Sequence, residues 1–196
     1  GSLQYISHLD LVRTMHKVIV RSDLPLWYTE GFNPHPYMTF LMPLPLGQSG
    51  MKEPLDIRIE GEMSFGEIKK RLNSVMPEGI EIVDVAKPEH KPNEIDAAEY
   101  EIDLWFEDAE KAEAFFVGSS KIIEGGVLNA EKRSKKGIKT VNLCELVRKF
   151  DVSASENKVF IKPVLAAGNT VNLNAELLVN SLLSELSLEE TDRNIK

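Results

Sequence analysis

The chain contains a single cysteine, Cys144, among its 196 residues. One thiol excludes a disulfide within the chain, and it excludes a zinc or iron–sulfur site built from cysteines of this chain alone. A cofactor held in that way would have to come from a partner protein.

Long hydrophobic runs and an excess of positive charge are also missing. No apolar run approaches the roughly 18 residues of a membrane span, and no basic segment followed by an apolar one stands at the start, so we predict a cytoplasmic protein with no membrane partner. The net charge of −8 argues against indiscriminate nucleic-acid binding, which depends on clustered lysine and arginine. The sequence also has no glycine-rich nucleotide loop, nucleophile elbow or Cys–His dyad.

One local run of positive charge stands out against this acidic background. It consists of Lys132, Arg133, Lys135, Lys136 and Lys139. The run is a candidate RNA-contacting hairpin, although acidic neighbours would limit its affinity, and a solvated loop is the other interpretation.

Proline is concentrated in the first third of the chain. Six of the ten prolines fall between Pro25 and Pro54, which stiffens this region well beyond an ordinary connection. Asn33 precedes a proline and His35 stands between two, so both are predicted to be extended. Gly31 can supply a turn with positive φ. Four aromatic residues surround these prolines, and they either stack on a ligand or anchor the loop: Trp27, Tyr28, Phe32 and Tyr37.

The element order predicts an α+β protein whose first domain, residues 1–90, is ferredoxin-like. Capping signals at Ser7 and Ser64 begin helices, the first of which reaches about residue 22. Alternating or apolar segments predict strands at residues 3–6, 38–44, 55–61 and 80–85. The resulting β-α-β-β-α-β order is the split βαβ arrangement, with two helices on one face of a four-stranded antiparallel sheet.

Residues 87–93 read as a linker to a second α+β domain over residues 94–190, predicted to be an α/β sandwich. We expect helices at residues 108–116 and 174–186, a helical turn or two at residues 144–149, and a frayed tail over residues 191–196. Strands are expected at residues 99–106, 122–129, 138–143 and 158–164.

Two histidines and a carboxylate form the candidate site of the first domain. His8 and Asp10 begin the first helix, and the segment carrying His35 is long enough to fold back toward them, at about 3.5 Å per residue. Two imidazoles and a carboxylate can ligate a transition metal, or act as a base with an orienting acid. A helix N-terminus with a nearby histidine and Arg21 would instead suit an anion. Asp10 also has a sufficient role as a helix-capping residue.

Several motifs together resemble the bacterial radical SAM-associated domain of unknown function. They are Ser7-His8-Leu9-Asp10, Arg21 with Leu24-Pro25-Leu26, Glu30-Gly31-Phe32-Asn33-Pro34-His35-Pro36, Leu44-Pro45-Leu46-Gly47 and Glu53-Pro54-Leu55-Asp56. The chain departs from the family pattern in a shorter first strand and in Thr29, where serine is common.

The resemblance implies an accessory domain, encoded beside or fused to a radical SAM protein. That partner would supply the iron–sulfur cluster and S-adenosylmethionine, and this chain would recognise the substrate, with RNA as the first candidate. The expected substrate-binding residues are His8, Asp10, Arg21, Glu30, Phe32, Asn33 and His35. Two alternatives stay open: a self-sufficient metal-dependent hydrolase using His8, Asp10 and His35, and a purely structural module that docks the partner through its proline-rich stretch.

Overall fold

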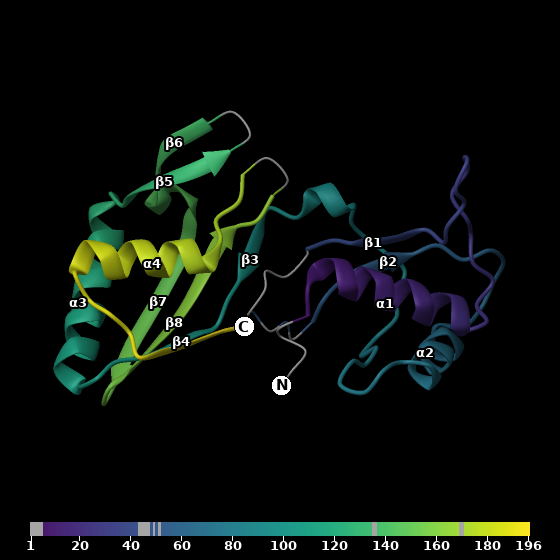
Figure 1. Cartoon of the computed structure of the whole chain (residues 1–196), viewed down its shortest axis with the longest axis horizontal. Coiled ribbons are helices and arrows are strands. Elements are labelled where there is room, and N and C mark those ends of the chain that lie inside the picture. Colours follow the sequence, from purple (N-terminus) through teal and green to yellow (C-terminus); the bar gives the residue numbers. More distant parts are fainter. Residues whose placement is uncertain (1–5, 43–47, 49, 51, 135–136, 169–170) are drawn as a thin grey trace. The chain divides into compact units, whose positions relative to one another are not determined.

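The computed structural model describes residues 6–42, 48, 50, 52–134, 137–168 and 171–196. The chain divides into two units, Gly1–Lys91 and Pro92–Lys196, and the boundary falls within the predicted linker. Helices and antiparallel sheets occur in both units, so the fold is α+β (Figure 1). Among the described residues, no helix combines the length and the apolar character needed to cross a membrane.

Both capping predictions for unit 1 are confirmed. Helix α1 spans His8–Arg21, and the Ser7 side chain accepts a hydrogen bond from the backbone N–H of Asp10. Helix α2 spans Phe65–Ser74, where the Ser64 side chain accepts from the N–H of Glu67 in the same way. Each serine thereby satisfies a backbone donor that has no partner within its helix.

The sheet of unit 1 pairs strand β1 (Met38–Phe40) antiparallel with β2 (Leu55–Ile57), in the register Met38↔Ile57. Both strands are shorter than predicted. The strand expected at residues 3–6 lies outside the described residues, apart from Ile6. The strand residues pack against a core supplied by the two helices and the turn after α1: Met15, Val18, Ile19, Leu24, Ile68 and Leu72.

The prediction of a strand at residues 80–85 is wrong. This segment runs along α2 instead of joining a sheet. The side-chain amide of Asn73 donates to the carbonyl of Ile82 and accepts from its N–H, at 3.1 and 2.8 Å, while Lys69 donates to the carbonyl of Val83. Side chains of α2 therefore replace the pairing that a neighbouring strand would provide. With one predicted strand missing and another outside the described residues, the ferredoxin-like arrangement stays a prediction.

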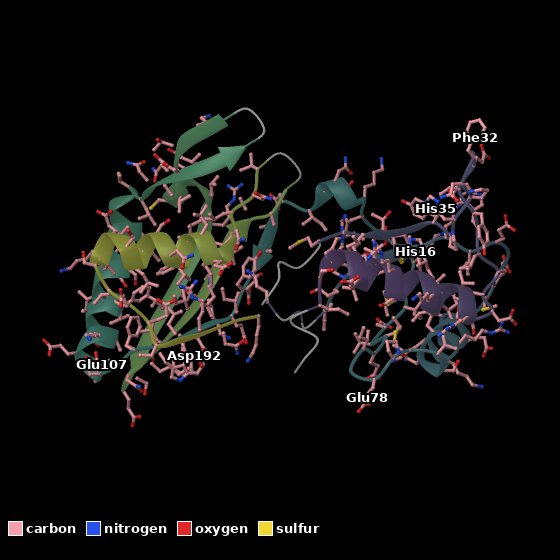
Figure 2. All side chains as sticks on the ribbon, in the orientation of Figure 1. His16, Phe32, His35, Glu78, Glu107 and Asp192 are labelled. Atoms are coloured by element: carbon pink, nitrogen blue, oxygen red, sulfur yellow. The ribbon has the colours of Figure 1, made fainter. Side chains whose placement is uncertain are left out.

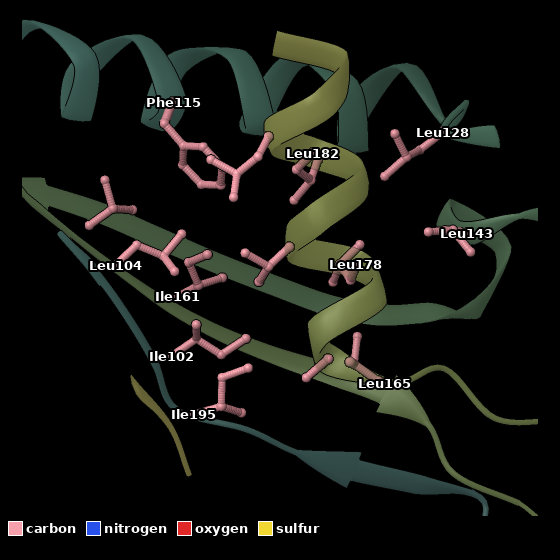
Figure 3. Packing of buried hydrophobic residues seen from close by; sticks show 14 of the residues in the cluster. Ile102, Leu104, Phe115, Leu128, Leu143, Ile161, Leu165, Leu178, Leu182 and Ile195 are labelled. Atoms are coloured by element: carbon pink, nitrogen blue, oxygen red, sulfur yellow. The ribbon is translucent and has the colours of Figure 1, made fainter. Parts of the chain in front are cut away.

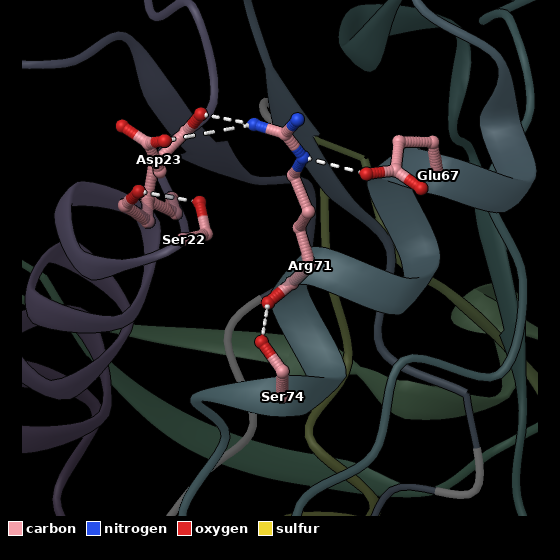
Figure 4. A network of polar contacts seen from close by, with 6 residues as sticks. Ser22, Asp23, Glu67, Arg71 and Ser74 are labelled. Carbon is pink, nitrogen blue, oxygen red and sulfur yellow. Dashed lines mark hydrogen bonds and ion pairs between the residues drawn. The ribbon is translucent and has the colours of Figure 1, made fainter.

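Arg71 joins the end of α1 to α2 (Figure 4). Its guanidinium donates to the backbone carbonyl of Asp23 at 2.6 Å and to the carboxylate of Glu67 at 2.8 Å. Asp23 has a φ of 55°, a left-handed conformation that turns the chain directly after the helix. Arg71 thus holds the segment that leads from α1 into the proline-rich stretch.

The sheet of unit 2 is antiparallel and has five strands. Strand β8 (Lys158–Ala166) pairs with β7 (Val147–Ser155), and also with β3 (Ala97–Glu99) and β4 (Ile102–Trp105). The two short strands β3 and β4 pair with successive parts of β8. Ala97 lies opposite Ala166, near the end of β8, and Trp105 lies opposite Lys158, at its start. Strand β9 (Asp192–Ile195) pairs with the other side of β4.

Helices α3 (Ala109–Gly125) and α4 (Ala175–Leu186) pack on this sheet (Figure 3). Residues of β4 and β8 alternate between buried and more exposed positions, so one sheet face points into the core. The largest buried side chains of the cluster come from both helices, the strands and the segments between them: Phe106, Phe115, Ile102, Leu104, Leu128, Leu143, Ile161, Leu165, Leu178 and Leu182.

Three predictions for unit 2 need correction. Residues 122–125 belong to α3, which ends at Gly126 with a φ of 71°, and strand β5 begins only at Asn129 (Asn129–Ser134). Residues 144–149 form a short 3₁₀ helix, Leu143–Leu146, and then the start of β7, which the sequence did not indicate. The supposed frayed tail is strand β9, which is held by the burial of Ile195 and by paired hydrogen bonds between Lys196 and Glu101.

Candidate functional site

The proline-rich stretch of unit 1 forms a projecting hairpin that we call the finger loop (residues 28–36). Tyr28 pairs with Pro36, and the N–H of Thr29 donates to the carbonyl of His35 at 2.9 Å. Gly31 makes the turn with a φ of 130°, a conformation that other residues rarely adopt. Phe32 lies at the tip with its side chain fully exposed, pointing away from the rest of unit 1 (Figure 2).

Three backbone segments meet at the base of the finger loop in a closed ring of hydrogen bonds. The N–H of Trp27 donates to the carbonyl of Arg58 (2.9 Å), that of Arg58 to Tyr37 (3.4 Å), and that of Tyr37 to Trp27 (3.1 Å). Each residue is therefore donor and acceptor once. The ring fixes both ends of the loop to the segment that follows β2, where Leu26 also forms an isolated bridge with Ile59.

Side chains reinforce the same base. The rings of Trp27 and Tyr37 meet edge to face with centroids 6.1 Å apart, and the guanidinium carbon of Arg58 lies 4.3 Å from the centre of the Trp27 ring. Cation–π and edge-to-face contacts of this kind each contribute about 0.5–1.5 kcal/mol. The aromatic residues thus divide between the two predicted roles: Trp27 and Tyr37 anchor the loop, and Phe32 is free to contact a ligand.

His35 lies on the return limb of the finger loop with its tautomer fixed. Its Nδ1 is 3.0 Å from the carbonyl oxygen of Asn33 and 3.2 Å from Oγ1 of Thr29, while its backbone N–H also donates to Thr29. A carbonyl oxygen can only accept, so Nδ1 carries the proton. The other ring nitrogen, Nε2, is then an unprotonated acceptor in the neutral ring.

The imidazole of His16, from the middle of α1, lies beside the imidazole of His35 (Figure 2). The two centroids lie 6.0 Å apart and the rings are inclined by 72°. Burial lowers the pKa of His16 below its ordinary value, and the neighbouring His35 lowers it further. The sequence indicated His16 only as a residue of the helix. The available signal was that three of the four histidines, His8, His16 and His35, occur in the first 35 residues.

His8 and Asp10 have other partners. The ring of His8 packs edge to face on Phe40 of β1, with centroids 5.5 Å apart. Asp10 accepts from the hydroxyl of Ser7 at 2.7 Å and from Arg13 at 3.2 Å, and these two hydrogen bonds hold the pKa of its carboxyl below the ordinary value. Asp10 therefore has the capping role that the sequence offered as its simpler explanation.

These contacts set His35 apart from the two residues with which the sequence grouped it. His8 and His16 are eight residues apart on one helix, a rise of about 12 Å, and it is His16 that lies next to His35. In the part of the chain that the structure describes, no three His, Cys, Asp or Glu side chains are grouped so that they could hold a metal ion. The alternative interpretation of His8, Asp10 and His35 as a three-residue metal site gains no support.

Arg21 lies at the wrong end of α1 for the predicted anion site. It is the last residue of the helix, about 20 Å along the axis from His8 at 1.5 Å per residue. One phosphate or carboxylate cannot contact both the helix N-terminus and Arg21. Like Arg21, the remaining predicted binding residues, Glu30 and Asn33, are exposed, and both lie within the finger loop.

The basic run of unit 2 forms part of a hairpin, as predicted. Strands β5 and β6 (Gly137–Asn142) pair with Lys132 opposite Lys139 and Arg133 opposite Ile138. Successive strand positions alternate between faces, so the basic positions are divided rather than gathered on one surface. Lys139 is exposed, whereas Lys135 and Lys136 lie outside the described residues.

A second cluster of aromatic and basic residues was not foreseen. On the face of the unit 2 sheet opposite α3 and α4, the ammonium of Lys158 lies 4.4 Å from the centre of the Trp105 ring and 4.2 Å from that of Phe160. Asp103 balances its charge at 3.4 Å. Alternation in β4 and β8 predicts that these residues share a face, but only the strand register shows that they are neighbours.

Comparison with known proteins gives one match. The model of a family described as "Uncharacterized protein conserved in bacteria (DUF2344)" matches residues 1–175, and this description names no radical SAM protein. Neither the curated proteins nor the solved structures contain a match.

Proposed function

Since the chain belongs to this family of uncharacterised bacterial proteins, we propose its function from its own geometry: it is a recognition module that binds RNA through the finger loop. The observation that carries this proposal is the complete exposure of Phe32 at the tip of a loop whose base is fixed. An exposed phenylalanine ring on a loop with a fixed base can stack on a planar ligand without first rearranging the loop.

RNA is the ligand class that an exposed aromatic tip suits. Unstacked bases of single-stranded RNA stack on phenylalanine rings, and each such contact contributes about 1–3 kcal/mol. Because hydrogen bonds hold the two ends of the finger loop, its tip loses little conformational entropy when it binds a ligand. Unit 2 offers further groups of the same kind, Phe160 with Lys158 on the sheet and Lys139 on the β5–β6 hairpin. Because the chain carries a net charge of −8, we expect it to bind RNA through a few stacking and cationic contacts rather than through extensive phosphate binding.

We further propose that the module acts with a radical SAM protein. The support is the resemblance of the finger-loop and helix-start motifs, together with the single cysteine, which leaves the cluster to be supplied by the partner. In such a system this chain would select the RNA and the partner would carry out the reaction. A cytoplasmic location belongs to the same proposal.

Fluorescence anisotropy with a labelled single-stranded RNA tests the proposed function. We expect Phe32→Ala to weaken binding roughly tenfold or more, because one stacking contact is lost. Phe65→Ala is the matched control, since Phe65 is a half-exposed phenylalanine at the start of α2, away from the finger loop. Circular dichroism would establish that both variants fold.

Two results would contradict the proposal. Wild-type protein that binds no single-stranded RNA, in the presence or absence of the radical SAM protein, would exclude RNA as the ligand. Equal weakening by Phe32→Ala and Phe65→Ala would show that the finger loop is not the binding element. A separate affinity measurement with the radical SAM protein tests the partnership.

A further inference from the structure

His16 and His35 are two titratable residues of unit 1 that the proposed stacking contact of Phe32 does not use. They come from different elements, the middle of α1 and the return limb of the finger loop, and their ring centroids are 6.0 Å apart. His16 is partly buried. We propose that these two histidines together bind a divalent transition-metal ion of the zinc type.

The spacing of the rings fits two ligands of one ion. A zinc–nitrogen distance of about 2.1 Å, with bond angles from tetrahedral to somewhat wider, places two imidazole centres about 5–6 Å apart. The inclination of 72° keeps the rings from stacking flat. Because rotation of an imidazole about χ2 has broad minima, the His16 ring can turn a nitrogen toward an ion bound at Nε2 of His35.

The backbone of the finger loop orients His35 as a ligand. The Nδ1 proton is held by the carbonyl of Asn33, which leaves the lone pair of Nε2 available. Metal-binding histidines commonly donate their second ring N–H to a carbonyl or carboxylate in this way, which orients the ring and fixes the tautomer. Pro34 and Pro36 restrict the backbone on both sides of the residue, so the ligand is positioned before the ion arrives.

The surroundings of His16 favour its neutral ring. Partial burial disfavours a proton on His16, and a charged His35 next to it would disfavour that proton further. A zinc-type ion instead takes up lone pairs from two neutral rings, and imidazole is a preferred ligand of zinc, copper and nickel. Two protein ligands leave coordination positions for water or for a donor atom of a bound substrate.

An ion at this place would link the finger loop to α1. The base of the loop is already fixed by the hydrogen-bonded ring of Trp27, Tyr37 and Arg58. Beyond this base, the described contacts between the two limbs are the Tyr28–Pro36 pairing and the hydrogen bonds between Thr29 and His35. A bond from each histidine to one ion would restrain this limb.

Zinc titration by isothermal calorimetry tests the site in the 196-residue chain after treatment with a chelator. We expect one Zn²⁺ per chain, bound about tenfold or more weakly after either His16→Gln or His35→Gln. His8→Gln and His90→Gln are matched controls that should bind as the wild type does. In nuclear magnetic resonance spectra, the ring nitrogens of His16 and His35 should shift together at the same zinc ratio.

Each other outcome overturns the assignment. Wild-type affinity in His16→Gln would show that His16 is not a ligand. Equal weakening by His8→Gln would favour the group of His8, Asp10 and His35 instead. Phe32→Ala separates this inference from the proposed function, because it should leave zinc binding unchanged even if RNA binding is lost.

Discussion

At the scale of single residues, the polar groups at the start of α1 serve the helix. Asp10 combines a hydrogen bond from Ser7, an ion pair with Arg13 and a position near the positive end of the helix dipole. All three favour its charged form. Such a residue looks the same in sequence as an active-site carboxylate, and only its partners distinguish the two.

We predict that the effect of Asp10→Asn depends on pH. The pKa of Asp10 is lowered in the folded protein, so its contribution to stability is present above the unfolded-state pKa of about 4 and is lost as the pH falls through the lower folded-state value. Urea unfolding at a series of pH values should therefore show the variant less stable than the wild type at pH 6 and equal to it near pH 2. A difference that persists unchanged at pH 2 would contradict the assignment.

The sequence singled out His35 and Phe32 because the spacing of the prolines restricts the backbone around them. It could not identify His16 as the neighbour of His35. The periodicity of α1 places His16 at the edge of its buried face, but which segment crosses that edge depends on how the finger loop folds back. That path is fixed by long-range hydrogen bonds to Arg58, which no local pattern encodes.

At the scale of elements, helices were predicted better than strands. The caps at Ser7, Ser64, Asp108 and Asn174 each accept a backbone hydrogen bond in the first turn of their helix, and this signal is local. Strand formation depends on partners far along the chain. Residues 80–85 alternate like a strand yet bind Asn73 of α2, whereas residues 192–195 have a polar sequence yet pair with β4.

The pairing of β9 with β4 can be tested directly by mutation. Ile195 is buried against the core of unit 2, so Ile195→Ala should lower the free energy of unfolding by about 2–5 kcal/mol. Asp192→Ala, at an exposed position of the same strand, should change it by no more than about 0.5 kcal/mol. Chemical denaturation measures both, and equal small effects would mean that the tail is frayed in solution.

At the scale of the whole molecule, each unit has its own hydrophobic cluster and its own tryptophan. Trp27 reports on unit 1 and Trp105 on unit 2. The composition alone allowed two domains, and the linker was predicted from Pro88 and Pro92. The strand order of unit 2 could not be predicted from the sequence. The central place of β8 depends on its pairing with β3, β4 and β7, which are distant along the chain or not marked by a local pattern.

We predict that core mutations act first on the unit that contains them. Leu182→Ala should destabilise unit 2 by about 2–5 kcal/mol, seen as an earlier urea transition of Trp105 fluorescence in a Trp27→Phe background. The transition of Trp27, observed in a Trp105→Phe background, should move less. Ile19→Ala should give the reverse pattern. Equal shifts at both tryptophans would show that the chain unfolds as one cooperative body.

The hydrogen-bonded ring at Trp27, Tyr37 and Arg58 separates the framework of unit 1 from the tip of the finger loop. All three of its bonds are made by backbone atoms, and none involves residues 30–34. Residues 30–33 can therefore be exchanged without breaking these three bonds, with Gly31 retained for its turn. The ring makes this segment an interchangeable cassette, suited to library selection for altered ligand preference on an unchanged scaffold.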